Sequence, residues 1–294
     1  AESLFWMSRY VERADSLARL VLVHQSDLLD TTTAMDEDIY HWHPLLAATS
    51  MGDEKSPESV QEYMVRSKEN PDSVVNCIYQ ARENGRAVRD QISDATWFEL
   101  NGLWHDLKMM LKEDASNFEE ICTLVNRFSL MFRGIVKVSH ARTESWAVIQ
   151  LGEYLERADK TSRLVDLPNF LPEGEESSTW NTILRTCNAL AEHRQNYQGE
   201  ADAASASTLL LFSPSFPRSV RFCAKQIDDL LHMVSGTSSG SYLDEAERAA
   251  GALLARLNFS GVEDIGLLGL HDYIDTLQYE LNEIGTAIAM RYFA

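Results

Sequence analysis

Two Glu-Arg pairs, Glu12-Arg13 and Glu156-Arg157, are the charged residues whose types and spacing best suit chemistry. Each Glu shares one polar strip of a helix with an i, i+4 pair. Those pairs are Asp15–Arg19 and Asp159–Arg163. Buried carboxylates can transfer protons, and neighbouring arginines can bind a small anionic or amino-acid-like group. The same charges can instead pair with one another in the core, so both interpretations stay open.

The two strips require long helices that are buried on most of their circumference. Along residues 2–22, apolar side chains cover two opposite sides and leave only the narrow strip polar. Arg13 and Arg157 lie off the strips, where their stems can pack among apolar residues while their guanidinium groups reach outward. Helical periodicity continues through most of the chain, and no stretch alternates with a period of two. The expected helices are 2–30, 38–50, 72–92, one from 93, 117–139, 141–166, 179–196, 217–235, 243–257 and 262–291, with loops at 166–178 and 235–241.

Two blocks of sequence occur twice in the same order. Residues 10–15 (YVERAD) reappear at 154–159 as YLERAD, 144 residues later. The block Pro-x-Ser-Val-x-x-Cys at 71–77 reappears at 217–223, 146 residues later. The spacing predicts half-chains of 1–143 and 144–294. We therefore expect an all-α helical bundle, formed by tandem duplication as a single domain with pseudo-two-fold symmetry.

The composition argues against several classes of protein. Asp and Glu total 45 against 26 Lys and Arg, and the formal charge of −19 disfavours nucleic-acid binding. No segment has the roughly 20 uncharged apolar residues of a membrane span, and we expect no membrane association. The four cysteines lie in apolar helical stretches without a C-x-x-C pair, as expected for free thiols in the cytoplasm. They are Cys77, Cys122, Cys187 and Cys223.

A stripe of arginines is the strongest local concentration of positive charge. It comprises Arg82, Arg86 and Arg89, and the matching helix of the second half adds Arg218 and Arg221. On so acidic a chain, this stripe is a candidate site for an anion or a carboxylate. The alternative is that the arginines pair with Glu83 and Asp90 on their own helix.

Motifs for metals, nucleotides and covalent catalysis give no support to an enzyme. His140 and Glu144 share a helix face, but the chain has no Glu-x-x-His motif of the kind that di-metal bundles use. We expect no metal site. The chain has no Gly-rich phosphate loop, so we expect no nucleotide or other cofactor on this chain alone. A Ser-His-Asp triad stays open, although no nucleophile elbow accompanies it.

Several sequence blocks resemble the Alpha-E family, named for a helical domain with a Glu-Arg motif. The matching blocks are residues 2–15, 69–74, 81–90 and 217–222. The resemblance covers nearly the whole chain; Ser8 stands where the family commonly has Gly, and Gly85 where it commonly has Ala. Family members tend to occur beside, or fused to, circularly permuted ATP-grasp proteins of the amide-ligase type. Transglutaminase-like proteins are frequent companions of the family.

Two functions are compatible with the sequence and with this resemblance. The first is an accessory or scaffold subunit of an ATP-grasp amide or peptide ligase, with a transglutaminase-like protein as a further candidate partner. The second is a stand-alone enzyme that uses Glu12, Glu156 and their arginines on a small amino-acid-like substrate. The missing catalytic motifs and the acidic composition favour the first function.

Overall fold

The computed structural model describes residues 1–30, 45–46, 60–112, 117–171 and 176–293, and these residues form helices and turns without any strand. The all-helical prediction is therefore confirmed for the described chain. The chain divides into two compact units. Unit 1 comprises Ala1 and Ser3–Glu153, and unit 2 comprises Glu2 and Tyr154–Ala294. The division falls inside one helix, α7 (Glu144–Val165), about ten residues after the predicted limit of the first half.

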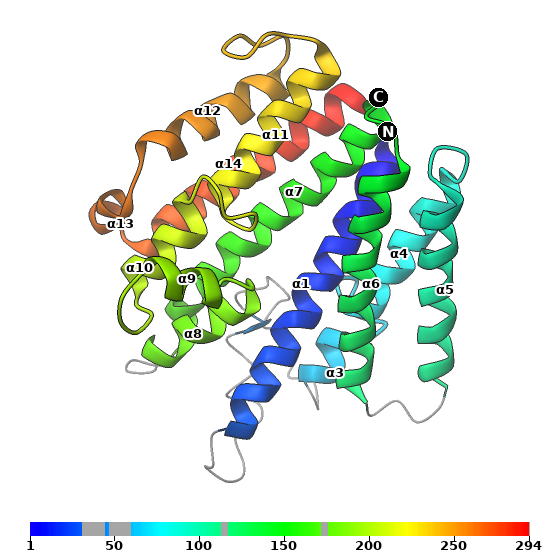
Figure 1. Cartoon of the computed structure of the whole chain (residues 1–294), viewed down its shortest axis with the longest axis horizontal. Coiled ribbons are helices and arrows are strands. Elements are labelled where there is room, and N and C mark those ends of the chain that lie inside the picture. The colour runs from blue at the N-terminus through cyan, green and yellow to red at the C-terminus, as the bar shows by residue number, and fades with distance from the viewer. Residues whose placement is uncertain (31–44, 47–59, 113–116, 172–175, 294) are drawn as a thin grey trace. The chain divides into compact units, whose positions relative to one another are not determined.

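Unit 1 is built from helices that are joined by capped turns. They are α1 (Glu2–Asp30), α3 (Val60–Val65), α4 (Val74–Ala87), α5 (Asp94–Met110), α6 (Phe118–Ser139) and the first part of α7. Helix α5 contacts both α4 and α6, and α3 contacts α4 and α6 as well. Figure 1 shows these helices. The side chains of Ser73, Ser93 and Asn117 cap α4, α5 and α6 by accepting a backbone N–H of the first turn.

Unit 2 continues α7 and adds shorter helices before a second packed group. The shorter elements are a 3-10 helix (Leu167–Phe170), α8 (Glu176–Thr186), α9 (Leu190–Asn196), α10 (Ala203–Ser207) and a π-helix (Thr208–Phe212). The later helices are α11 (Val220–Ser235), α12 (Glu245–Phe259), α13 (Val262–Leu268) and α14 (Leu270–Tyr292). Helix α12 packs against both α11 and α14, and α13 lies against α14 (Figure 1).

Helices α4 and α11 begin with the same turn. In each, the N-cap serine accepts the backbone N–H three residues on, from Asn76 to Ser73 and from Phe222 to Ser219. Each serine hydroxyl also donates to the carbonyl oxygen six residues earlier, that of Ser67 in unit 1 and that of Ser213 in unit 2. The corresponding atoms of the two turns are therefore 146 residues apart, as are the two sequence blocks.

The helix boundaries differ from the prediction where backbone conformation breaks a periodic pattern. The helix expected at 179–196 is two helices, because Asn188 between them has a positive φ of 53°. The helix expected at 262–291 is likewise divided at Gly269, where φ is 89°. The loop expected at 166–178 contains the 3-10 helix and the start of α8. Of the helix expected at 38–50, only Leu45 and Leu46 lie within the described residues, and both are helical.

The four cysteines lie in the interior, as their apolar surroundings in the sequence predict. All four cysteines are buried free thiols, and burial raises the pKa of the Cys122 thiol to about 12. Among the described helices, none is long and apolar enough to cross a membrane.

Candidate functional site

The polar strip of α1 is an ion-pair network inside unit 1. Glu12 and Asp15 are each only 1% exposed. Arg133 of α6 brings one guanidinium nitrogen, Nη2, within 2.6 Å of both Glu12 Oε2 and Asp15 Oδ2. Arg19 donates from Nη1 to the same Asp15 oxygen at 2.5 Å, which confirms the predicted i, i+4 pair. The Glu of the first Glu-Arg motif is therefore already engaged by a guanidinium from another helix.

The network of unit 1 extends to the first part of α7. Arg133 Nε lies 3.4 Å from Glu153 Oε1, and Gln150 donates from Nε2 to Glu153 Oε2 at 2.9 Å. Three carboxylates and two guanidinium groups, from α1, α6 and α7, thus compensate one another in the interior. Such pairing lowers the electrostatic cost of burying charge, which is the property expected of a structural core network.

Two small residues explain how closely α1 and α7 approach each other in unit 1. The Ser8 hydroxyl donates to the Ile149 carbonyl oxygen at 2.6 Å. A Cβ atom built at Gly152 would lie 2.4 Å from both the Phe5 carbonyl oxygen and Ser8 Oγ. A side chain at Gly152 therefore does not fit without movement of backbone atoms. The space that these small residues leave is used by a neighbouring helix.

The polar strip of α7 in unit 2 takes a cation from its own helix. Glu156 is fully buried, and Lys160 Nζ lies 3.6 Å from Glu156 Oε1 and 3.3 Å from Asp159 Oδ2. Arg163 donates from Nε to Asp159 at 3.0 Å and 3.1 Å, which confirms the second predicted pair. Burial alone would raise the pKa of Asp159, but Lys160 and Arg163 outweigh the desolvation and lower this pKa. Asp159 is therefore held as a carboxylate.

The arginines of the two Glu-Arg motifs are held beside aromatic rings. The Arg13 guanidinium lies over the Tyr10 ring, 5.4 Å from its centroid, and forms an ion pair with Asp72. Arg157 lies over Tyr154 at 5.3 Å and is only 6% exposed. The expectation that both guanidinium groups reach outward is wrong for Arg157, because the aromatic ring and the surrounding core enclose it.

Two members of the arginine stripe, Arg82 and Arg86, pair with Glu83 on α4, as one of the two interpretations predicts, whereas Arg89 lies beyond the end of this helix. Arg82 and Arg86 each approach a Glu83 oxygen at 2.5 Å. Arg82 also donates to Asn101 Oδ1 on α5 at 2.9 Å. The guanidinium groups of Arg82 and Arg89 lie 5.7 Å and 5.6 Å from the Trp97 ring. The side chain of Arg86 is 64% exposed.

The two arginines expected to extend this stripe lie in unit 2. Arg221, in the first turn of α11, donates to Asn258 Oδ1 at 2.9 Å and to the Phe212 carbonyl oxygen at 3.2 Å. Arg218 is half-buried in the turn that precedes α11. Arg221 therefore joins α11 to α12 and to the π-helix, which is a structural use of its donors.

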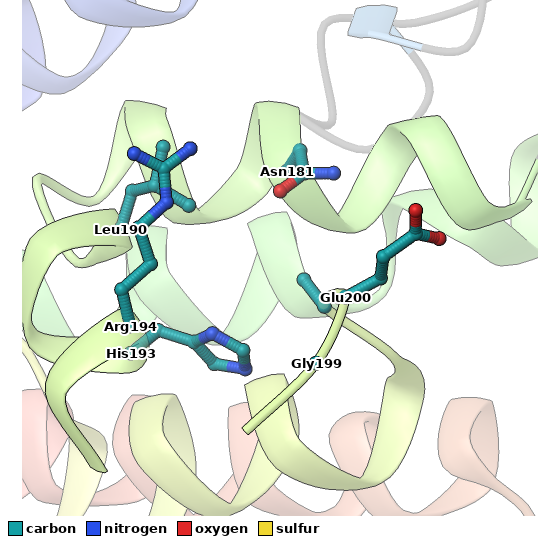
Figure 2. A pocket seen from close by; sticks show the side chains of 7 residues that line it. Asn181, Leu190, His193, Arg194, Gly199 and Glu200 are labelled. Atoms are coloured by element: carbon teal, nitrogen blue, oxygen red, sulfur yellow. The ribbon is translucent and has the colours of Figure 1, made fainter. Parts of the chain in front are cut away.

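A cavity of about 330 Å³ in unit 2 lies beside α8 and α9 (Figure 2). Its lining residues are Asn181, Leu190, His193, Arg194, Gly199, Glu200 and Ala201. His193 Nε2 lies 2.9 Å from Ser205 Oγ, and that hydroxyl lies 2.7 Å from Asp202 Oδ1. A catalytic triad places the His between the Ser and the Asp, whereas here Ser205 lies between the other two. Asp202 and Ser205 form the capping box of α10, so this group stabilises a helix start.

The pair His140 and Glu144, which the sequence places one turn apart, is divided between two elements. His140 ends α6, and its Nε2 accepts the Ser93 backbone N–H at 3.4 Å. Glu144 begins α7. Burial lowers the pKa of His140, so its imidazole is a neutral acceptor near the start of α5.

The sequence analysis missed the cations that neutralise the two strips. Arg133 is 121 residues from Glu12 in the chain, and no local pattern marks it as a partner. Lys160 was detectable, because it lies four residues after Glu156 and one after Asp159. Each strip contains two acidic residues but only one arginine. If both acids are buried, a second cation is needed to balance their charge, and this imbalance could have been noticed in the sequence.

Comparison with known proteins identifies relatives over nearly the whole chain. Residues 1–293 match a family model, Alpha-E, described as a predicted alpha-helical domain with a conserved ER motif. An uncharacterized protein of Mycobacterium bovis and an uncharacterized protein of Mycobacterium tuberculosis strain H37Rv are each 24% identical over 307 residues. The aligned region covers 96% of this chain and 34% of each relative, so the chain spans about a third of their length. No solved structure matches the chain.

Proposed function

Because the chain belongs to the Alpha-E family of helical domains with an ER motif, we propose that it is a non-catalytic module of a ligase complex. The partner in this proposal is a circularly permuted ATP-grasp amide or peptide ligase, and a transglutaminase-like protein is a second candidate. The module would act as a scaffold or accessory subunit in the cytoplasm, where its four free cysteines would stay reduced.

The observation that carries this proposal is the pairing of the motif carboxylates within each unit. Glu12 is held by Arg133, and Glu156 lies beside Lys160. A general base must reach a substrate proton. These carboxylates are instead buried, and each forms an ion pair with a neighbouring cationic side chain. In this proposal, the ER motif stabilises the packing of helices, which is a structural role expected of a scaffold.

The greater length of the relatives supports the proposal that this chain acts together with other protein segments, either in one polypeptide or as a separate subunit. In the mycobacterial relatives, the aligned region is 34% of a longer chain. The formal charge of −19 would favour a partner with a positively charged surface, because complementary charges speed and select association. Arg86, exposed on α4, is a candidate contact because it places a positive group on an acidic protein.

We also propose that the chain arose by tandem duplication and that its halves have related folds. The matching turns before α4 and α11 support this, since their hydrogen bonds join corresponding atoms 146 residues apart. The order of contacts supports it as well. Helix α5 contacts α4 and α6 in unit 1, and α12 contacts α11 and α14 in unit 2.

The accessory role is tested by adding the purified chain to a purified circularly permuted ATP-grasp protein of the same organism, and measuring the release of ADP. The expected result is a change in the ADP rate on addition, with no ATP turnover by the chain alone. Arg86→Glu should weaken the effect and leave Tm nearly unchanged, because its pair with Glu83 is exposed. Lys108→Glu, the same charge change on α5, should leave the effect intact. A ligase that runs equally well without the chain would contradict the proposal.

A stand-alone enzyme is the alternative, in which the Glu-Arg strips act on a small amino-acid-like substrate. Turnover of an amide or peptide substrate by the isolated chain, lost in Glu12→Gln or Glu156→Gln, would establish this alternative. The accessory role predicts that no such turnover is observed.

A further inference from the structure

An imidazole at the start of α14 is held by a buried carboxylate at the end of α7. His271 Nδ1 lies 2.9 Å and 3.1 Å from the two oxygens of Asp166. Asp166 is 3% exposed, and Asn169 donates from Nδ2 to Asp166 Oδ1 at 2.6 Å. The chain Asn169–Asp166–His271 therefore fixes the ring from its buried side, all within unit 2.

The other side of the ring is open and faces a second carboxylate. A carboxylate accepts a hydrogen bond, so Asp166 keeps the proton of the neutral ring on Nδ1 and leaves the Nε2 lone pair free. His271 Nε2 lies 3.7 Å from Asp275 Oδ2, one turn further along α14. The side chains of His271 and Asp275 are 49% and 62% exposed. Phe170 meets the imidazole edge-on, with centroids 6.0 Å apart, and limits its rotation.

These features together describe a ligand set for a metal ion. Protein ligands of zinc lie about 2.0–2.2 Å from the metal, so two neighbouring ligand atoms in a tetrahedral site are about 3.3–3.5 Å apart. The separation of 3.7 Å between Nε2 and Oδ2 needs only a small side-chain rotation to meet this value. Histidines that bind metals almost always donate their other ring N–H to a carboxylate or a carbonyl, as His271 does to Asp166.

We propose that His271 Nε2 and Asp275 bind a divalent transition-metal ion of the zinc class, and that Asp166 is the positioning residue. The imidazole nitrogen argues against magnesium and calcium, which prefer oxygen ligands. The exposed side of the ion would keep water or an outside ligand in its remaining positions. The sequence analysis expected no metal because it sought a Glu-x-x-His motif. This donor set is His-x-x-x-Asp, with Asp166 supplied from 105 residues away.

The test is a calorimetric titration of the full chain with Zn²⁺, repeated with Co²⁺ to record the visible absorption of the bound ion. The wild-type chain should bind one ion per chain through this site. His271→Ala should abolish that binding, and Asp275→Asn should weaken it by at least about tenfold. Asp166→Asn keeps both ligand groups but changes the group that orients the ring. It should weaken binding about 10- to 100-fold at unchanged stoichiometry and shift the Co²⁺ spectrum.

The matched control is His105→Ala, because His105 is also exposed on a helix but has Met109 at i+4 in place of a carboxylate. This variant should bind Zn²⁺ as the wild-type chain does. Absence of one-site binding in the wild-type chain would overturn the proposal. Retention of wild-type affinity by His271→Ala would overturn it as well. Either result leaves the accessory role untouched, since that role does not depend on a metal.

Discussion

The strips of unit 1 and unit 2 have the same acids and the same arginine at the same spacing, but they differ in the origin of their additional cation. In unit 1 the cation is Arg133, which comes from α6 and contacts both carboxylates of α1. In unit 2 it is Lys160, which is one turn from Glu156 on α7 itself. A cation from a distant segment ties two helices together, whereas one from the same helix mainly neutralises charge. Arg133 should therefore contribute more to tertiary stability than Lys160 does.

The largest expected effect is that of Arg133→Met. Loss of the guanidinium leaves Glu12 and Asp15 without the ion pairs it makes in the interior of unit 1, which costs about 3–5 kcal/mol of unfolding free energy. Urea denaturation followed by circular dichroism measures this cost. Lys137→Met, an exposed position on the same helix, is the control and should change stability by less than about 0.5 kcal/mol. A small effect of Arg133→Met would mean that solvent or other groups satisfy the strip.

The next effect concerns Ser8 and Gly152, which occupy corresponding positions one turn before each Glu. Gly152→Ala should destabilise by about 1–3 kcal/mol, because the added Cβ would meet the Phe5 carbonyl oxygen and the Ser8 hydroxyl at 2.4 Å. Gly134→Ala on α6 is the matched control, since its Cβ would meet nothing within 4 Å. It should stabilise by up to about 1 kcal/mol through helix propensity. Equal effects of the two substitutions would contradict the close approach of α1 and α7.

A pH-dependent effect distinguishes the strip of unit 2. The pKa of Asp159 is lower in the folded chain than its ordinary value, so its ionised form binds its partners better than its protonated form does. That stabilisation is present above the unfolded pKa of about 3.9 and is lost as the pH falls through the lower folded pKa. Asp159→Asn should cost about 1–2 kcal/mol at pH 7, and progressively less as the pH falls below about 4. A cost that is independent of pH would show that the charge of Asp159 is irrelevant.

The smallest effect is expected for Lys160→Met. Lys160 Nζ lies 3.6 Å from Glu156 Oε1 and 3.3 Å from Asp159 Oδ2, farther than the 2.6 Å contacts of Arg133, and Asp159 keeps its pair with Arg163 when the lysine is removed. Ion pairs at longer separation are weaker, so the expected loss is about 1 kcal/mol. The same denaturation experiment applies, and the comparison requires the loss to be clearly smaller than that of Arg133→Met. Equal losses would show that the origin of the cation does not matter.

Local signals in the sequence were sufficient for much of the fold. The helix at 2–30 and the pairs Asp15–Arg19 and Asp159–Arg163 follow from helical periodicity, because both partners lie within one turn. Breaks at Asn188 and Gly269 were missed because a positive φ at one residue does not disturb the apolar pattern around it. Arg133 and the pairing of Asp166 with His271 were out of reach, since each partner is more than 100 residues away. Long-range partners depend on helix packing, which a single sequence does not specify.

A double-mutant cycle of Glu12→Gln and Arg133→Met tests the structural role of the ER motif most directly. The quantity measured is the unfolding free energy of the wild-type chain, both single variants and the double variant. We predict a coupling energy of at least about 2 kcal/mol, with the double variant more stable than Arg133→Met alone. A coupling energy near zero would contradict the account, because the ion pair between Glu12 and Arg133 would then contribute nothing to stability.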